Sequence, residues 1–118
     1  MGIRSRLLGV PGASRGGGAT TGLSAAGSTQ SDATAALDEV TVVSTVALGA
    51  GVRLRGDLEP GDSQVVANHG ANGLSVYPPT GGTIGLLAVN DCAVLLPGAT
   101  AVFYCASNAA SGFTFVVK

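Results

Sequence analysis

The sequence predicts an all-β protein: a single antiparallel β-sandwich or small barrel of about seven or eight short strands, with an extended N-terminal arm. From residue 37 onward, β-branched segments recur at roughly ten-residue spacing, as in small sandwiches and barrels. Turn residues separate these segments, because the chain contains 19 glycines and 5 prolines in 118 residues. We therefore divide the chain into an arm, residues 1–36, and a β-module, residues 37–118.

The arm has the composition of a segment that does not fold alone. It contains no aromatic side chain, and its only acidic residue is Asp32. Small and polar residues dominate 19–36, so this stretch cannot bury enough apolar surface to offset the entropy lost on ordering. We expect the arm to be disordered until a partner orders it. The side chains expected to contact that partner are Ile3, Arg4, Arg6, Leu7, Leu8, Val10 and Arg15.

The β-module divides into short apolar segments. Strands are expected at residues 40–47, 52–54, 64–68, 74–77, 83–89 and 113–117. Asn72-Gly73 suits the positive φ values of a tight turn, so residues 69–73 are expected to join a β-hairpin. A weak echo of residues 66–76 in residues 105–115 is interpreted as two similar hairpins. A solenoid would need at least three repeats.

A second hairpin is expected between the two cysteines, at residues 92–105. A turn at Gly98-Ala99 places Cys92 opposite Cys105 and Val94 opposite Phe103. Two buried reduced thiols that act as small apolar groups are one interpretation of the pair. A cross-strand disulfide is geometrically allowed but disfavoured by synthesis in a cytoplasm, and a reactive thiol would need a basic neighbour that the sequence does not supply.

Charge is sparse and unevenly distributed. Charged residues make up 11% of the chain, less than half the usual share of about 25%. Residues 1–20 carry three arginines and no acid, while residues 21–118 carry three basic and seven acidic residues. A surface this poor in charge suits packing against protein neighbours. Three arginines without aromatic residues make nucleic-acid binding unlikely, and no apolar stretch is long enough to cross a membrane.

The sequence contains no recognisable constellation of catalytic or metal-binding residues. His69 is the single histidine and lies in a turn, so neither a catalytic triad nor a histidine pair for a metal can be assembled. The glycine-rich run at residues 12–21 lacks the Gly-Lys-Ser/Thr ending of a phosphate loop. The acids Asp57, Glu59 and Asp62 fit no calcium-loop consensus. We therefore expect no enzymatic activity, no cofactor and no metal.

Residues 65–84, VVANHGANGLSVYPPTGGTI, resemble a pattern common in small β-rich structural proteins of tailed bacteriophages and prophages. Residues 96–103, LPGATAVF, and 27–34, GSTQSDAT, are similar to other segments of those proteins, so the resemblance covers about residues 23–118. Gly85-Leu86 follows Ile84 here, where those proteins usually have Asn-Gly. The shared motifs are turns and core positions, which imply a virion component and no catalytic role.

The resemblance and the arm together predict a capsid decoration (cement) protein. Such a protein would bind and stabilise the capsid shell through its arm and β-module after synthesis in the host cytoplasm. Its expected partners are the major capsid protein or other virion proteins, and copies of itself, with a trimer favoured. The alternatives are a tail, collar, vertex-spike or fibre-associated component, and a receptor- or carbohydrate-binding module that uses Tyr77 and Tyr104 to stack on sugars.

Overall fold

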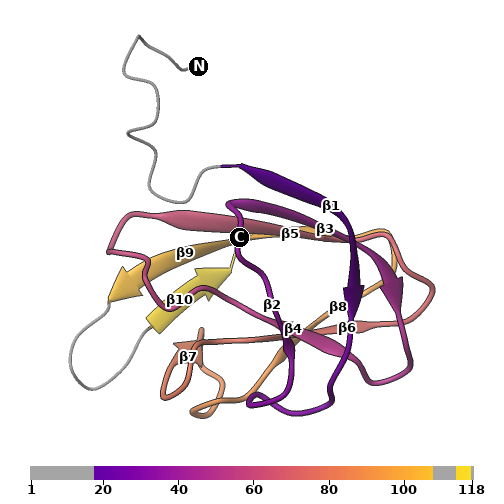
Figure 1. The fold of residues 1–118 in the computed structure, drawn as a ribbon. Helices are drawn as coiled ribbons and strands as arrows, with labels where there is room; N and C mark the ends of the chain where they lie inside the picture. The colour runs from indigo at the N-terminus through magenta and orange to yellow at the C-terminus, as the bar shows by residue number, and fades with distance from the viewer. Residues whose placement is uncertain (1–17, 108–113, 118) are drawn as a thin grey trace, which may run out of the picture.

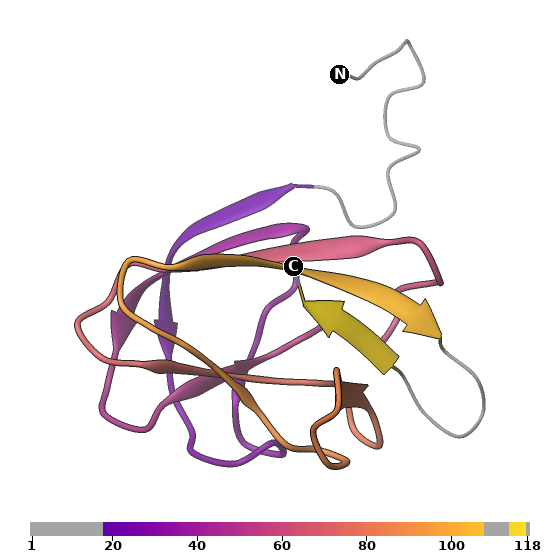
Figure 2. The same ribbon diagram turned by 180° about the vertical axis from the view of Figure 1, so that it is seen from behind.

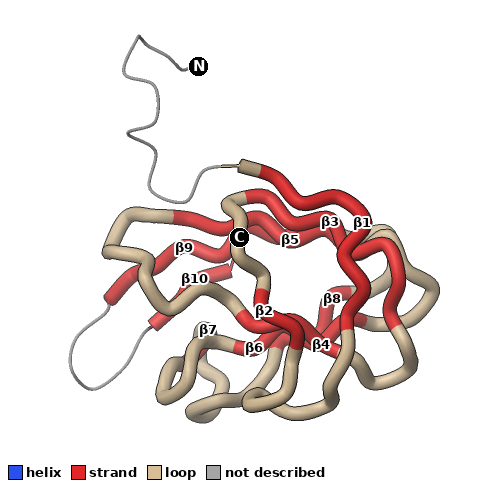
Figure 3. Tube along the Cα trace, in the orientation of Figure 1, coloured by secondary structure: helices blue, strands red, loops and turns tan. Residues whose placement is uncertain are grey.

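The computed structural model describes residues 18–107 and 114–117, which form ten strands and no helix (Figures 1 and 3). The all-β prediction is therefore confirmed. The strands are β1 (Ala19–Ala25), β2 (Thr34–Ala35), β3 (Val40–Val46), β4 (Gly51–Arg53), β5 (Ser63–Asn68), β6 (Leu74–Tyr77), β7 (Thr83–Ile84), β8 (Ala93–Leu95), β9 (Thr100–Ser107) and β10 (Thr114–Val117).

Two sheets face each other, and successive strands of the first half alternate between them. The large sheet has the order β1-β3-β5-β9-β10-β7, and the small sheet has the order β2-β4-β6-β8. The first three strands of each sheet are parallel, with Val40 paired to Ala19 and Val65 in the large sheet. The chain therefore makes three stacked turns, and each turn contributes one strand to each sheet. Paired positions in the large sheet are 21 residues apart between the first and second turns (40 minus 19) and 25 residues apart between the second and third (65 minus 40).

The last four strands complete both sheets. In the large sheet, β9 lies antiparallel to β5 and to β10, and β10 lies parallel to the short β7. In the small sheet, β8 lies antiparallel to β6. Figure 2 shows the result from behind: the parallel turns are followed by antiparallel strands that extend both layers beyond the third turn.

The mixed sheets correct the expected antiparallel sandwich. Strands 64–68 and 74–77 exist as β5 and β6, but they lie in different sheets and form no hairpin. Residues 69–73 instead cross between the layers, fixed by Asn68, whose side chain accepts a hydrogen bond from the Gly70 amide and donates to the Asn72 carbonyl. Of the two similar hairpins expected at 66–76 and 105–115, the second is present as the antiparallel pair β9 and β10, and the first is not. The three parallel turns have no recognisable sequence repeat.

The cysteine hairpin is also wrong. Strand β8 pairs with β6, and β9 pairs with β5 and β10, so the two segments lie in different sheets. The turn at residues 96–99 carries the chain from one layer to the other, because the Asn68 backbone bonds both Gly98 and Ala99. Cys92 and Cys105 are both free thiols; Cys105 is buried and Cys92 is partly exposed. No disulfide joins them.

The boundary of the arm also differs from the expectation. Strand β1 pairs in parallel with β3 along its whole length, and Ala25, Ala33 and Ala36 are buried. Residues 19–36 were expected to be disordered because they lack large apolar groups. Backbone pairing to β3 and close packing of alanines need no large side chains, so this stretch belongs to the folded body. The seven predicted partner-contacting residues of the arm lie outside the described residues.

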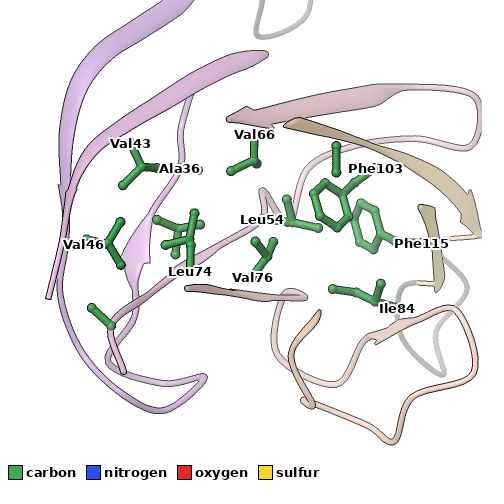
Figure 4. Close-up of a cluster of buried hydrophobic side chains, with 14 of the residues drawn as sticks. Ala36, Val43, Val46, Leu54, Val66, Leu74, Val76, Ile84, Phe103 and Phe115 are labelled. Carbon is green, nitrogen blue, oxygen red and sulfur yellow. The ribbon is translucent and has the colours of Figure 1, made fainter. Parts of the chain in front are cut away.

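The core lies between the two sheets and is shown in Figure 4. Phe103 and Phe115 from the large sheet meet Val76 of the small sheet and Ile84 of the edge strand β7, while Leu74 packs further along the small sheet. All five side chains are at most 2% exposed. Inward-facing positions alternate with outward-facing ones along β5 and β9, as a half-buried strand requires.

Candidate interaction surfaces

Two fully buried amide side chains hold successive turns together. Gln64 donates to the carbonyls of Ala36 (2.8 Å) and Asp38 (3.0 Å), and its Oε1 accepts from the Arg55 amide (3.0 Å). Asn68 donates to the carbonyls of Asn72 and Leu95 and accepts from Gly70. Because every one of these partners is main chain, the two side chains fix where the crossings between the sheets run.

Residues 26–33 cover the part of the small sheet's outer face where β4 and β6 end, and leave Val94 of β8 63% exposed. The Tyr77 hydroxyl donates to the Ser28 carbonyl at 2.9 Å, and Arg53 donates to the Gln30 carbonyl at 3.2 Å. Gln30 itself is 9% exposed and donates to the Pro78 carbonyl. Desolvation by burial, with Cys92 nearby, raises the pKa of Tyr77 above its ordinary value. Tyr77 is 8% exposed and engaged, so its ring is not available to stack on a sugar.

The outer face of the large sheet carries apolar and hydroxyl side chains, and no strand among the described residues covers it. Its outward-facing apolar residues are Val40, Val42, Val65, Val102, Tyr104 and Val116, which we call the valine face. Val40, Val65 and Val102 form one cross-strand row, and Tyr104 pairs with Val116 in the next. Exposure reaches 36% for Val40, 41% for Tyr104 and 49% for Val116.

No charged side chain interrupts this face. The six strands of the large sheet contain no Asp, Glu, Lys, Arg or His residue at all. Free-standing sheets usually carry charged residues that discourage association, and their absence marks a surface suited to protein contact. The valine face spans four strands, β3, β5, β9 and β10. At about 4.8 Å between strands and about six residues per strand at ~3.3 Å each, it measures about 19 by 20 Å, or ~380 Å².

Four acidic residues lie at one end of the valine face. Asp38 and Glu39 precede β3, and Glu59 and Asp62 precede β5, so all four lie where these parallel strands begin. Thr20 donates to the Asp38 carboxylate, and Asp62 accepts from the Glu59 amide. The described residues hold two arginines and seven acids, a formal charge of 2 − 7 = −5, whereas residues 1–17 hold three arginines and no acid.

A second exposed apolar segment follows β7. Leu86, Leu87 and Val89 are 105%, 39% and 59% exposed. Asn90 closes this loop by donating its backbone amide to the Gly82 carbonyl and by accepting from the Gly81 amide at 2.7 Å. The sequence was interpreted as a strand through residue 89, but β7 ends at Ile84. Gly85, with φ of +58°, breaks the alternation and is the signal that marks the loop.

The acidic and metal-ligating side chains of the described residues do not form a cluster. No cluster of three or more His, Cys, Asp or Glu side chains in the described ranges could hold a metal ion. The predicted acidic loop does not converge on a point, because Asp57 forms an ion pair with Arg55 at 2.7 Å and Asp62 bonds the Glu59 amide. A solvent-open depression of about 310 Å³ between the ends of β1 and β3 is lined mostly by Ala and Gly, with Asp32 its only charged side chain.

Burial raises the pKa of the Cys105 thiol above its ordinary value, which favours an unreactive, protonated group. The pKa of Asp32 shifts the other way, because hydrogen bonds from Thr29 lower it.

Among residues 18–107 and 114–117, no helix has the length and apolar character needed to span a bilayer.

Comparison of the chain with protein-family models, with curated proteins and with solved structures finds no match.

Proposed function

We propose that this protein is a structural component of a tailed-bacteriophage virion, and specifically a decoration protein that binds the outside of the capsid shell. The valine face carries the proposal: it is a mainly apolar surface, uninterrupted by charge, on a small body. The resemblance of residues 65–84 to phage structural proteins is the reason for proposing a phage virion as the particle. The partners would be the major capsid protein and other copies of the chain.

Within this proposal, residues 1–17 attach the body to the shell. The body carries a formal charge of −5, and the segment before it carries +3 from Arg4, Arg6 and Arg15. The arginines would pair with carboxylates of the shell, and the apolar residues Ile3, Leu7, Leu8 and Val10 would occupy neighbouring contacts. Many weak attachments of this kind stabilise a shell by mass action.

The test is binding to shells that lack the protein. Purified full-length protein and a variant that begins at Gly18 are mixed with such shells, and bound protein is measured after sedimentation. Because β1 starts at Ala19, the truncation leaves every described strand intact. We expect the full-length protein to saturate the shell and the truncated one to stay in solution with an unchanged circular dichroism spectrum. Equal binding by the two would refute the role of residues 1–17.

A charge-preserving control separates sequence from charge. Changing the three arginines to lysine keeps +3, and changing them to glutamine removes it. If bidentate pairing matters, lysine should weaken binding partly and glutamine strongly. Full retention of binding by the glutamine variant would leave the arginines without a role.

Copy number distinguishes the shell from other parts of a virion. Quantitative mass spectrometry of intact particles should give hundreds of copies for a shell component. A count of three, five, six or twelve would instead place the protein at the tail, collar, vertex or a fibre. A sugar-binding module is disfavoured by the burial of Tyr77, since Tyr104 is then the one exposed tyrosine among the described residues.

A further inference from the structure

We propose that the valine face binds the valine face of a second copy of this chain, with the strands of the two copies running in opposite directions. The inference concerns self-association of the purified protein, and it holds whether or not the protein belongs to a virion. It rests on the area of the face, on its exposure and on the distribution of charge around it.

The area fits a weak symmetric dimer. Each copy offers about 380 Å², so two stacked faces bury about 760 Å², which is the size of a weak, transient contact and below that of a stable specific interface. A twofold dimer uses the same patch on both copies, whereas a trimer needs two different complementary patches. The valine face is one patch on four neighbouring strands, and its outward-facing valines and tyrosine can interdigitate with those of a second copy as the layers of a sandwich do. It therefore favours a dimer over the trimer expected from the sequence.

The charges select the relative orientation of the two copies. Asp38, Glu39, Glu59 and Asp62 all lie at the end of the face where β3 and β5 begin. The connections at the opposite end, residues 47–50, 69–73 and 96–99, contain no acidic residue, and His69 is their one ionisable group. Asp32 lies in the segment that covers part of the small sheet.

If the strands of the two copies ran in the same direction, the acidic ends would meet and repel. If they run in opposite directions, each acidic end faces the acid-free end of its neighbour. The twofold axis then lies in the plane of the interface and crosses the strands. Along this axis the row Val40, Val65 and Val102 faces its own copy, residue against like residue.

Sedimentation velocity of the full-length protein over a range of concentrations tests the association. We expect a monomer–dimer equilibrium that Val65→Lys shifts to the monomer by at least tenfold. Leu48→Lys is the matched control, because Leu48 is 89% exposed in the β3–β4 turn and lies off the face. Tyr104→Lys is a second variant at a more exposed position, in case Val65→Lys does not fold. A wild-type protein that stays monomeric up to about 1 mM would overturn the proposal.

Crosslinking tests the orientation. Single cysteines are placed at Val40, Val65 or Val102 in a Cys92→Ser background, and a bismaleimide of about 8 Å is used because stacked sheets lie ~10 Å apart. Opposed strands predict that each of the three variants crosslinks to itself. Strands in the same direction would let only the Val65 variant do so and would join the Val40 variant to the Val102 variant, which would refute the orientation. Cys105 is 2% exposed and should not react.

Discussion

Replacement of Asn68 by alanine should be among the most destabilising single changes in the body. The side chain is fully buried and makes three hydrogen bonds of 2.8–2.9 Å, to the Gly70 amide and to the carbonyls of Asn72 and Leu95. At about 1 kcal/mol per bond the loss is ~3 kcal/mol, and it is larger if the main-chain groups stay unsatisfied. A domain of this size has roughly 5–15 kcal/mol in total, so a substantial fraction disappears.

Urea unfolding followed by circular dichroism measures the effect. With an m value of about 1.5 kcal/mol per molar, the midpoint should fall by ~2 M. Asn68→Asp keeps the shape and the bond from Gly70 but aims a carboxylate at two carbonyls, so it should be at least as destabilising as alanine. Asn72→Ala is the graded control. The Asn72 side chain donates one hydrogen bond, to the Val46 carbonyl at 2.8 Å, so its loss should cost about 1 kcal/mol.

The urea midpoints of the Asn68 and Asn72 variants together test whether the buried Asn68 amide stabilises the crossing between the sheets. Equal midpoints for Asn68→Ala and Asn72→Ala would mean that the buried amide does not hold the crossing between the sheets. The reasoning from hydrogen-bond number and burial would then be refuted for this site.

Three further outcomes are expected. Gly51→Ala should cost about 2 kcal/mol, because the new methyl would lie 2.6 Å from the Ser75 carbonyl oxygen and 2.8 Å from the Tyr77 ring; an unchanged melting temperature would contradict the close packing. Tyr77→Phe should cost about 1 kcal/mol and speed proteolysis within residues 26–33, since it removes the bond to Ser28; an unchanged cleavage rate would count against this anchor. Burial raises the pKa of Cys105 above the ordinary 9.0, so the thiol loses its proton at lower pH in the unfolded chain than in the folded one. The free energy of unfolding should therefore fall as pH rises above about 9, and it should fall less in Cys105→Ala. Equal urea midpoints at pH 7 and pH 10 would contradict this expectation.

Local features of the fold follow from the sequence, whereas the topology does not. The strands at residues 40–47, 64–68 and 74–77 are visible in their β-branched and alternating residues, and the structure places β3, β5 and β6 there. The residues of a strand do not determine which other strand it pairs with. Asn72-Gly73 is compatible with a hairpin turn. In the structure the same residues cross from one sheet to the other, because the buried Asn68 amide bonds their main chain.

The parallel turns escape sequence analysis for a related reason. Successive turns advance 21 and then 25 residues, and the paired positions Ala19, Val40 and Val65 share no motif. Strand β1 is especially hard to foresee, because its stability comes from main-chain bonds to β3 and from small side chains. Its composition alone resembles that of an unfolded segment.

The valine face was partly within reach of the sequence. Low overall charge already indicated a surface made for protein contact, and the alternation in β9 separates outward Tyr104 from inward Phe103 and Cys105. Which strands combine into one uncharged face depends on the order β1-β3-β5-β9-β10, and that order is a property of the fold.

The edges of the sheets argue that association occurs through this face and not through added strands. Unpaired edges invite other chains, and proteins protect them by shortness and by bulges. At one edge of the large sheet, β1 has register shifts on both sides of Leu23, and Gly22 has φ of +84°. At the other edge β7 has two residues, and at the edge of the small sheet β8 has three. None of these edges offers a long regular ladder. The valine face has no comparable protection and carries no charged side chain, so a partner can bury apolar area there without competing with a bulge.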